Sequence, residues 1–139
     1  MVELLLASCA LCGLAIASYF SLVYYHLLEP DNRWIPSFCR MEKKSCIHIL
    51  GTPEAAVFGV PNSLLGALYY AAILLLPMPS LEIYFLLASI FSVGLGMYLM
   101  HALVVKLKIH CPLCYTAHGI NLLIANLFIV REVQAHFVQ

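Results

Sequence analysis

The chain has 139 residues, of which 63% are apolar and 10% are charged, and its formal net charge is zero. A soluble globular protein averages roughly 45–50% apolar and about 25% charged residues, so this composition excludes a soluble enzyme and a disordered chain. The balanced charge also excludes the basic field that binds nucleic acid. The sequence therefore predicts an integral membrane protein.

Four apolar runs are long enough to cross a bilayer, which takes about 20 residues as a helix. None alternates apolar and polar residues in the way that the strands of a membrane barrel do. We predict an all-α membrane protein, a single domain built as a bundle of four transmembrane helices. The helices are expected at about residues 4–28, 57–78, 81–105 and 111–130.

The connections between these helices differ greatly in length. Residues 29–56 form a long extramembrane loop between the first two helices, and this loop holds 8 of the 14 charged residues. A loop of that length in so small a protein is usually functional. Four crossings place both termini on one side of the membrane, and they place the loop and the short link 106–110 together on the other side.

Two of the three cysteine pairs lie on the side of the loop. Cys39 and Cys46 belong to the loop, and Cys111 and Cys114 open the fourth helix. Pro112 suits the first turn of a helix, where the helix dipole favours a thiolate. Two dithiols on one membrane face indicate relayed thiol–disulfide exchange. Such a relay needs a terminal electron acceptor, and inside a membrane a lipid-soluble quinone is the natural candidate.

One face of the fourth helix carries polar residues at helical spacing. Polar side chains at membrane depth face the bundle interior, and their cost makes them candidates for function. The polar residues are His118 and Asn121. The alternative is that they only form hydrogen bonds with neighbouring helices and have no further role. The remaining cysteines, Cys9 and Cys12, lie near the other end of the first helix, where packing is the expected role.

The loop pair leaves two further interpretations open. Cys39 and Cys46 are seven residues apart and could form a structural disulfide within the loop. They could also bind zinc together with His48 and His110, although metal sites usually show tighter spacing.

The cysteines belong to an ordered set of residues that resembles the vitamin K epoxide reductase family, including its prokaryotic disulfide-forming members. The resemblance covers roughly residues 36–130, and its order along a four-span chain is far more specific than a lone CxxC. The chain looks like a short member without a fused thioredoxin-like domain. The matching positions are Cys39, Cys46, Thr52, residues 57–61 (VFGVP), residues 62–66 (NSLLG), residues 111–114 (CPLC) and residues 120–122 (INL).

The resemblance implies a role for each catalytic residue. Cys39 would exchange with a separate thioredoxin-like protein and pass electrons to Cys46. Cys46 would then attack at Cys111, leaving Cys114 to face the quinone. Thr52 corresponds to a family hydroxyl that lies near this last cysteine.

The resemblance also implies a quinone pocket. Asn62 matches an asparagine that hydrogen-bonds a quinone carbonyl, and Phe58 and His118 are the other expected quinone-binding residues. The vitamin K-reducing animal members have a tyrosine at the position of His118, and histidine can donate a hydrogen bond as well. This departure leaves ubiquinone, menaquinone and a vitamin K-like quinone as candidate acceptors, and no metal is expected.

The leading hypothesis is a membrane dithiol–quinone oxidoreductase that supports disulfide-bond formation. One alternative is a small membrane carrier of mercuric-type metal ions, which also uses cysteine pairs. Another is a disulfide-forming quinone reductase of different architecture, which carries its CxxC in or beside the first large loop. Free thiols would favour the carrier, and a disulfide would favour either enzyme.

The sequence gives two opposing indications of orientation. Six of the seven Lys and Arg residues lie on the cysteine side, which the positive-inside rule would place in the cytoplasm. Disulfide chemistry favours an oxidising, non-cytosolic face. We expect a prokaryotic cell membrane with the cysteine face outside the cytosol, and the alternatives are the endoplasmic reticulum membrane or an inverted topology.

Overall fold

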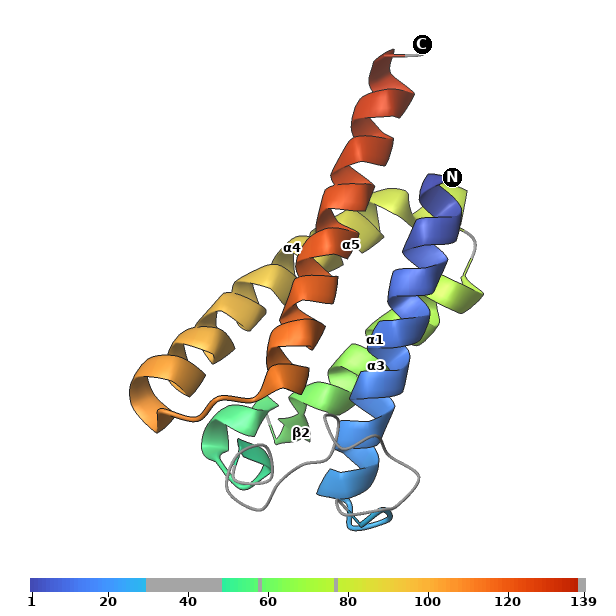
Figure 1. The fold of residues 1–139 in the computed structure, drawn as a ribbon. Helices are drawn as coiled ribbons and strands as arrows, with labels where there is room; N and C mark the ends of the chain where they lie inside the picture. The colour runs from blue at the N-terminus through green and yellow to red at the C-terminus, as the bar shows by residue number, and fades with distance from the viewer. Residues whose placement is uncertain (30–48, 58, 77, 138–139) are drawn as a thin grey trace.

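The structure is a computed structural model that describes residues 1–29, 49–57, 59–76 and 78–137. The described part contains four α-helices: α1 (Val2–Tyr24), α3 (Asn62–Leu75), α4 (Met78–His101) and α5 (Pro112–Phe137). Figure 1 shows both chain termini at one end of the bundle, and β2 and the link between α4 and α5 at the other. The expected placement of the termini and of this link is therefore confirmed.

Three helical segments are long and apolar enough to cross a membrane: Val2–Tyr24, Ser80–Leu107 and Pro112–Ala135. Helix α3 has only 14 residues. At 1.5 Å per residue it is about 21 Å long, which is less than the hydrocarbon core of about 30 Å. The all-α character is confirmed, whereas the length of the second helix was overestimated.

The second apolar run starts as a β-hairpin instead of a helix, so the expected helix start at residue 57 is wrong. Strand β1 (Ala56–Val57) pairs antiparallel with β2 (Val60–Pro61). Gly59 in the turn has φ +81°, a conformation that glycine adopts without strain. Pro61 has an extended ψ of 133° and disfavours the helical conformation for the residue before it, so α3 begins only at Asn62.

Two other boundaries differ from the expected ones on the loop side. Helix α1 ends at Tyr24 and not at residue 28, and His26 has a left-handed φ of 57°. Helix α4 continues past residue 105 as a π-helical segment, η3 (Ala102–Leu107), which ends at Lys108 with φ 52°. Of the expected loop 29–56, residues 30–48 lie outside the described residues, and the rest includes a 3-10 turn, η2 (Pro53–Ala55).

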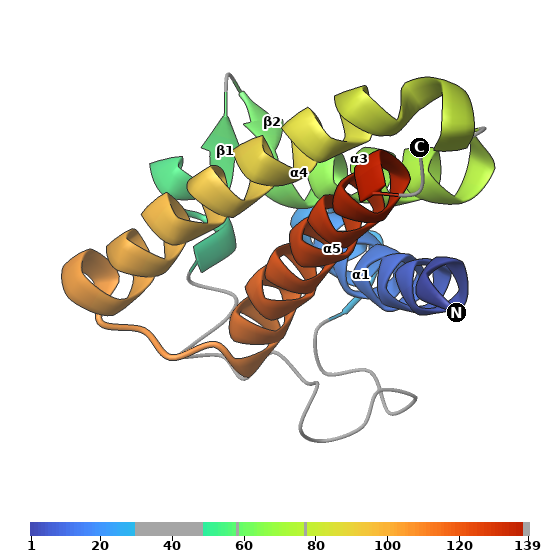
Figure 2. The same ribbon diagram turned by 90° about the horizontal axis from the view of Figure 1, so that it is seen from above.

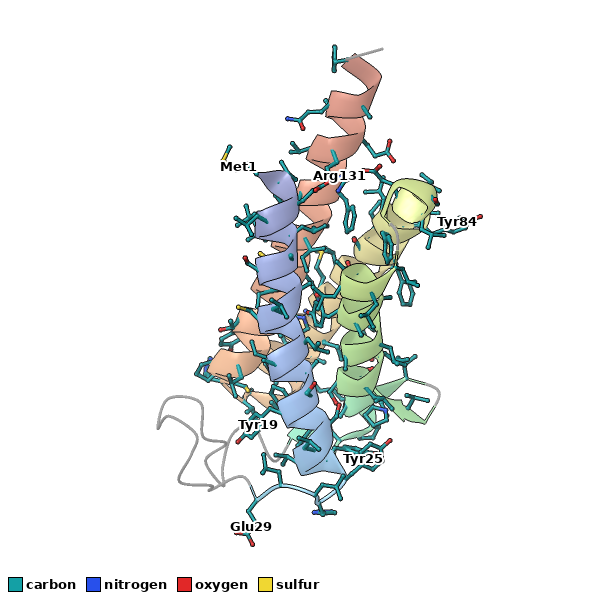
Figure 3. All side chains as sticks on the ribbon, turned by 90° about the vertical axis from the view of Figure 1, so that its right-hand side faces the viewer. Met1, Tyr19, Tyr25, Glu29, Tyr84 and Arg131 are labelled. Carbon is teal, nitrogen blue, oxygen red and sulfur yellow. The ribbon has the colours of Figure 1, made fainter. Side chains whose placement is uncertain are left out.

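Near the chain termini, α4 starts earlier and α5 ends later than expected. Helix α4 already begins at Met78, because proline is tolerated in a first helical turn. Helix α5 runs seven residues beyond residue 130, where Arg131 ties three helices together. Its Nε lies 2.8 Å from a carboxylate oxygen of Glu82 on α4, and its Nη1 lies 3.6 Å from Glu3 on α1. Figure 3 shows Arg131 and Met1 at this end of the bundle.

The helices pack in a defined order around α5. Helix α5 contacts both α4 and α1, and Figure 2 shows it between them. Helices α1 and α3 form the closest pair and run side by side in Figure 3. Near the chain termini the core includes the stacked rings of Phe85 and Phe128, whose centroids are 5.9 Å apart.

Small residues allow α1 and α3 to approach closely, as they do in many membrane helix pairs. Gly13 of α1 faces the ring of Tyr70 on α3, which is only 2% exposed. About two turns away along the helices, the Ser21 hydroxyl donates to the Ser63 hydroxyl at 3.1 Å. The contact at Gly13 is the tighter one, because a Cβ added there would lie 2.5 Å from the Tyr70 ring.

Gly13→Ala should therefore destabilise the bundle by about 1–3 kcal/mol, the usual cost of overpacking a core. The matched control is Gly94→Ala on α4, where an added Cβ meets nothing within 4 Å. The midpoint of thermal unfolding in detergent should fall for the first variant and not for the second. Equal midpoints for the two variants would contradict the proposed contact.

Candidate functional site

The two cysteines that open α5 differ in redox state. Pro112 is the first residue of α5, so Cys111 stands at the helix start and Cys114 one turn further in, as predicted. Cys111 is fully buried and disulfide-bonded, whereas Cys114 is half-buried and free. The CxxC motif is therefore not closed on itself in this structure.

The other four cysteines fall into two groups. Cys9 and Cys12 on α1 are both free. Cys9 packs in the hydrophobic core, in keeping with the expected packing role, but Cys12 is exposed on the helix surface. Cys39 and Cys46 lie outside the described residues.

A cavity of about 360 Å³ lies between α1, α3, α4 and α5. Most of its lining is apolar, which is typical of a site for a small organic ligand. The structure brings three of the predicted site residues to this cavity from two helices: Asn62, Cys114 and His118. We expected a pocket between the starts of the second and fourth helices, and the cavity lies there and extends to α1 and α4.

Asn62, the first residue of α3, has one half of its amide group paired. Its Nδ2 donates to the backbone carbonyl of Glu54 at 2.8 Å. Its Oδ1 is buried and has no hydrogen-bond partner among the described residues. A buried acceptor without a partner costs free energy, so this oxygen is a candidate for contact with a ligand.

Glu54 connects Asn62 to η3, the segment that extends α4. Its carboxylate accepts a hydrogen bond from Nζ of Lys106 in η3 and forms an ion pair with it. This hydrogen bond holds the pKa of Glu54 below its usual value, so the carboxylate stays charged at neutral pH. The ion pair thus links the segment that anchors the Asn62 amide to η3, whose Leu103 and Leu107 also line the cavity.

His118 lies one turn beyond Cys114 on the same face of α5. Its Nδ1 is buried and, in the part of the chain that the structure describes, has no hydrogen-bond partner. The ring fits because residue 96 on α4 is glycine, since a Cβ there would lie 2.8 Å from this nitrogen. His118 is therefore a second polar group that borders the cavity with an unused hydrogen-bonding atom.

The inner end of the cavity is bordered by a hydrogen-bonded pair from α3 and α5. The Tyr70 hydroxyl donates to Oδ1 of Asn121 at 2.5 Å, and both residues line the cavity. Asn121 follows Cys114 by seven residues, so it lies on the same helix face about 10 Å deeper. Asn121 thus hydrogen-bonds to a neighbouring helix, which is one of the two roles expected for it from the sequence.

One predicted site residue in the described part of the chain, Thr52, is not brought to the cavity. The Thr52 hydroxyl donates to the carbonyl of Ile49 at 2.7 Å, and Thr52 is not among the described residues that line the cavity. Its neighbours Ile49 and Leu50 do line it. Phe58 lies outside the described residues.

The zinc hypothesis is tested only in part. His110 Nδ1 hydrogen-bonds to the Tyr115 hydroxyl at 2.9 Å. Within the described part of the chain no three His, Cys, Asp or Glu residues are grouped as metal ligands would be. The other three residues of the hypothesis, Cys39, Cys46 and His48, lie outside that part.

Sequence reasoning missed the residues that shape the cavity. Tyr70 and the pair of Glu54 with Lys106 were given no role, because their contacts join residues 51 and 52 positions apart. The only sequence signal for such contacts was a glycine inside an apolar helix, as at Gly13 and Gly96. Such a glycine often allows a side chain of a neighbouring helix to approach closely. A glycine does not, however, indicate which side chain of the neighbouring helix will pack against it.

The cavity and its cysteines lie within the stretch that matches a known family. The model of the vitamin K epoxide reductase family matches residues 4–129, which includes α1 and so extends beyond the stretch on which the resemblance rested. No curated protein matches the chain. With the match covering most of the sequence, the chain is a membrane oxidoreductase linked to quinones, and it belongs to the vitamin K epoxide reductase family.

Proposed function

We propose that this protein oxidises the dithiol of a separate thioredoxin-like protein and passes the electrons through two cysteine pairs to a lipid quinone. The observation that carries this proposal is the state of the CxxC motif, in which Cys111 is disulfide-bonded and Cys114 is free at the cavity. In the net reaction one partner dithiol and one quinone give one partner disulfide and one quinol. The product disulfide would support disulfide-bond formation in other proteins.

The relay begins at the loop cysteines. A thiolate of the partner attacks Cys39 in a Cys39–Cys46 disulfide, and Cys46 leaves as a thiolate. The second thiol of the partner then attacks the partner's own sulfur in this mixed disulfide, which forms the partner disulfide and releases Cys39 as a thiolate. Cys46 then attacks Cys111 in a Cys111–Cys114 disulfide and expels Cys114 as a thiolate. A disulfide at Cys111 beside a free Cys114 supports this mixed-disulfide intermediate.

The electrons then pass to the quinone. The Cys114 thiolate donates its electron pair to the ring by adding to it. Cys39 attacks Cys46 and releases Cys111, which closes a disulfide on the Cys114 sulfur. The ring leaves with two electrons and takes up two protons as the quinol, so both cysteine pairs are oxidised again.

Asn62 and His118 would orient the ring beside Cys114. The Asn62 amide is anchored by Glu54, so its Oδ1 and its second N–H group are left for the ligand. The N–H group can donate to a quinone carbonyl, and Oδ1 can accept from a quinol hydroxyl. The unpartnered Nδ1 of His118 supports a second contact.

The family resemblance supports further roles for Phe58 and Thr52. Phe58 is proposed to pack against the quinone ring. Thr52 would have to release the Ile49 carbonyl for its hydroxyl to reach Cys114. The quinone is proposed to be ubiquinone, menaquinone or a vitamin K-like molecule.

Family membership disfavours the mercuric-type carrier. Such a carrier binds its ion through free thiolates, whereas Cys111 is in a disulfide. Cys9 and Cys12 are free, but no third metal-binding side chain joins them in the described part of the chain. The oxidoreductase accounts for the disulfide directly.

We further propose that the chain crosses the membrane four times. Both termini lie at one end of the bundle, so the short α3 and its hairpin would complete a second crossing (Figure 1). The end that carries Cys111 is proposed to face away from the cytosol, because disulfide formation needs an oxidising compartment.

On intact cells, a membrane-impermeant thiol reagent should therefore label a cysteine placed at Lys108, in the link between α4 and α5. The variant is made in a background without native cysteines. Labelling only after the cells are permeabilised would reverse the proposed orientation. A cysteine placed at Gln134 in α5 should show the opposite behaviour.

Cys114→Ala should trap a Cys46–Cys111 disulfide, because the thiol that resolves it is gone. Peptide mapping under oxidising conditions would detect this bond, and a Cys39–Cys46 disulfide alone would contradict the order of the relay. Cys9→Ala and Cys12→Ala serve as controls. They should turn over within about tenfold of wild type, which corresponds to about 1.4 kcal/mol in the barrier.

Asn62→Ala and His118→Ala should each lower the rate of quinone reduction by roughly two orders of magnitude. A donor aimed at a developing charge in a water-poor site contributes roughly 3–4 kcal/mol. Exchange of the loop cysteines with an added thioredoxin-like protein should be unaffected, and His118→Tyr should keep much of the activity. Wild-type rates in both alanine variants would place the quinone elsewhere.

A further inference from the structure

The inner end of the cavity holds an amide group that the proposed relay does not use. Asn121 lines the cavity beyond His118, and the Tyr70 hydroxyl donates to its Oδ1 at 2.5 Å. This hydrogen bond occupies the oxygen end of the Asn121 amide. The Nδ2 group lies on the other side of the amide and has no hydrogen-bond partner among the described residues.

Tyr70 is held rigidly enough to orient this amide. Its side chain is 2% exposed, and its ring occupies the space that Gly13 leaves open on α1. Gly66 also lies close to the ring, since a Cβ added there would be 3.8 Å from the Tyr70 ring. The close approach of Gly13 therefore restricts the movement of the ring away from Asn121.

His118 and Asn121 stand one turn apart on the same face of α5, and side chains at that spacing are neighbours with Cβ atoms about 5–6 Å apart. Both line the cavity, and both have a nitrogen without a partner in the described part of the chain. A carbonyl oxygen has two lone pairs and can accept from two donors. Two donors at this spacing can therefore converge on a single oxygen atom.

We propose that Asn121 is a further quinone-binding residue, oriented by Tyr70, and that its Nδ2 group and the His118 ring donate to the same quinone oxygen. This inference rests on the proposed quinone site. Negative charge gathers on that oxygen when Cys114 adds to the ring, so two fixed donors would stabilise the transition state. The neutral amide keeps its protons throughout, so it acts on charge and not as an acid.

The test compares single and double variants with dithiothreitol as the electron donor and short-chain ubiquinone or short-chain menaquinone as the acceptor. Asn121→Leu should lower kcat/KM for quinone by about a hundredfold. Tyr70→Phe should lower it by about tenfold, because the amide stays but loses its orientation. The matched control is Asn126→Leu on the exposed side of α5, where Nδ2 pairs with the backbone of its own helix and activity should be unchanged.

The double variant separates positioning from a merely structural effect. If Tyr70 acts through Asn121, then Tyr70→Phe in the Asn121→Leu background should cause no further loss of kcat/KM. An additive further loss would overturn the positioning role. Should Asn121→Leu fail to fold, wild-type kcat/KM in Tyr70→Phe would still overturn the proposal.

The outcomes also separate this inference from the proposed function. Wild-type kcat/KM in Asn121→Leu, with large losses in Asn62→Ala and His118→Ala, would refute the role of Asn121 and leave the quinone site in place. Wild-type values in all three variants would refute the quinone site itself. The rate of Cys114-dependent thiol exchange, followed without quinone, should be the same in every variant.

Discussion

A hydroxyl or an amide inside a bilayer has no water to pair with, so it must find its partner within the protein or in a ligand. Most of the buried polar side chains of this bundle meet that requirement across helices. Tyr69 pairs with Ser89, Tyr70 pairs with Asn121, and Ser21 pairs with Ser63. These bonds join α3 to α4, α5 and α1, so the shortest helix is also the most cross-linked one.

The candidate site contains most of the buried polar atoms that do not meet this requirement. In the described part of the chain, three buried side-chain atoms have no hydrogen-bond partner: Asn62 Oδ1, His118 Nδ1 and Arg131 Nη1. The last lies 3.6 Å from a Glu3 carboxylate at the end with the chain termini. The other two belong to residues that line one cavity with Cys114. The unmet hydrogen bonds and the free thiol therefore coincide, as expected where a polar ring binds and takes up electrons.

The late start of α3 positions Glu54 beside Asn62 at the cavity. The hairpin takes up the residues that a full-length helix would have used, and so it brings Glu54 beside the first residue of α3. The Glu54 carbonyl anchors the Asn62 amide, and the Glu54 carboxylate pairs with Lys106 in η3. A helix that began at residue 57 would have carried Asn62 into its second turn and would have lost this anchor.

The sequence by itself determined the helical membrane architecture, the common end of the CxxC motif and the α4–α5 link, and the position of Cys114 one turn into α5. These features follow from the length of apolar runs, from helical periodicity and from the preference of proline for a first turn, all of which are local. Only the tertiary structure decided that Asn62, Cys114 and His118 share a cavity and that Tyr70 hydrogen-bonds to Asn121. Those relations depend on how closely helices approach, and a glycine such as Gly13 or Gly96 permits that approach without naming its partner.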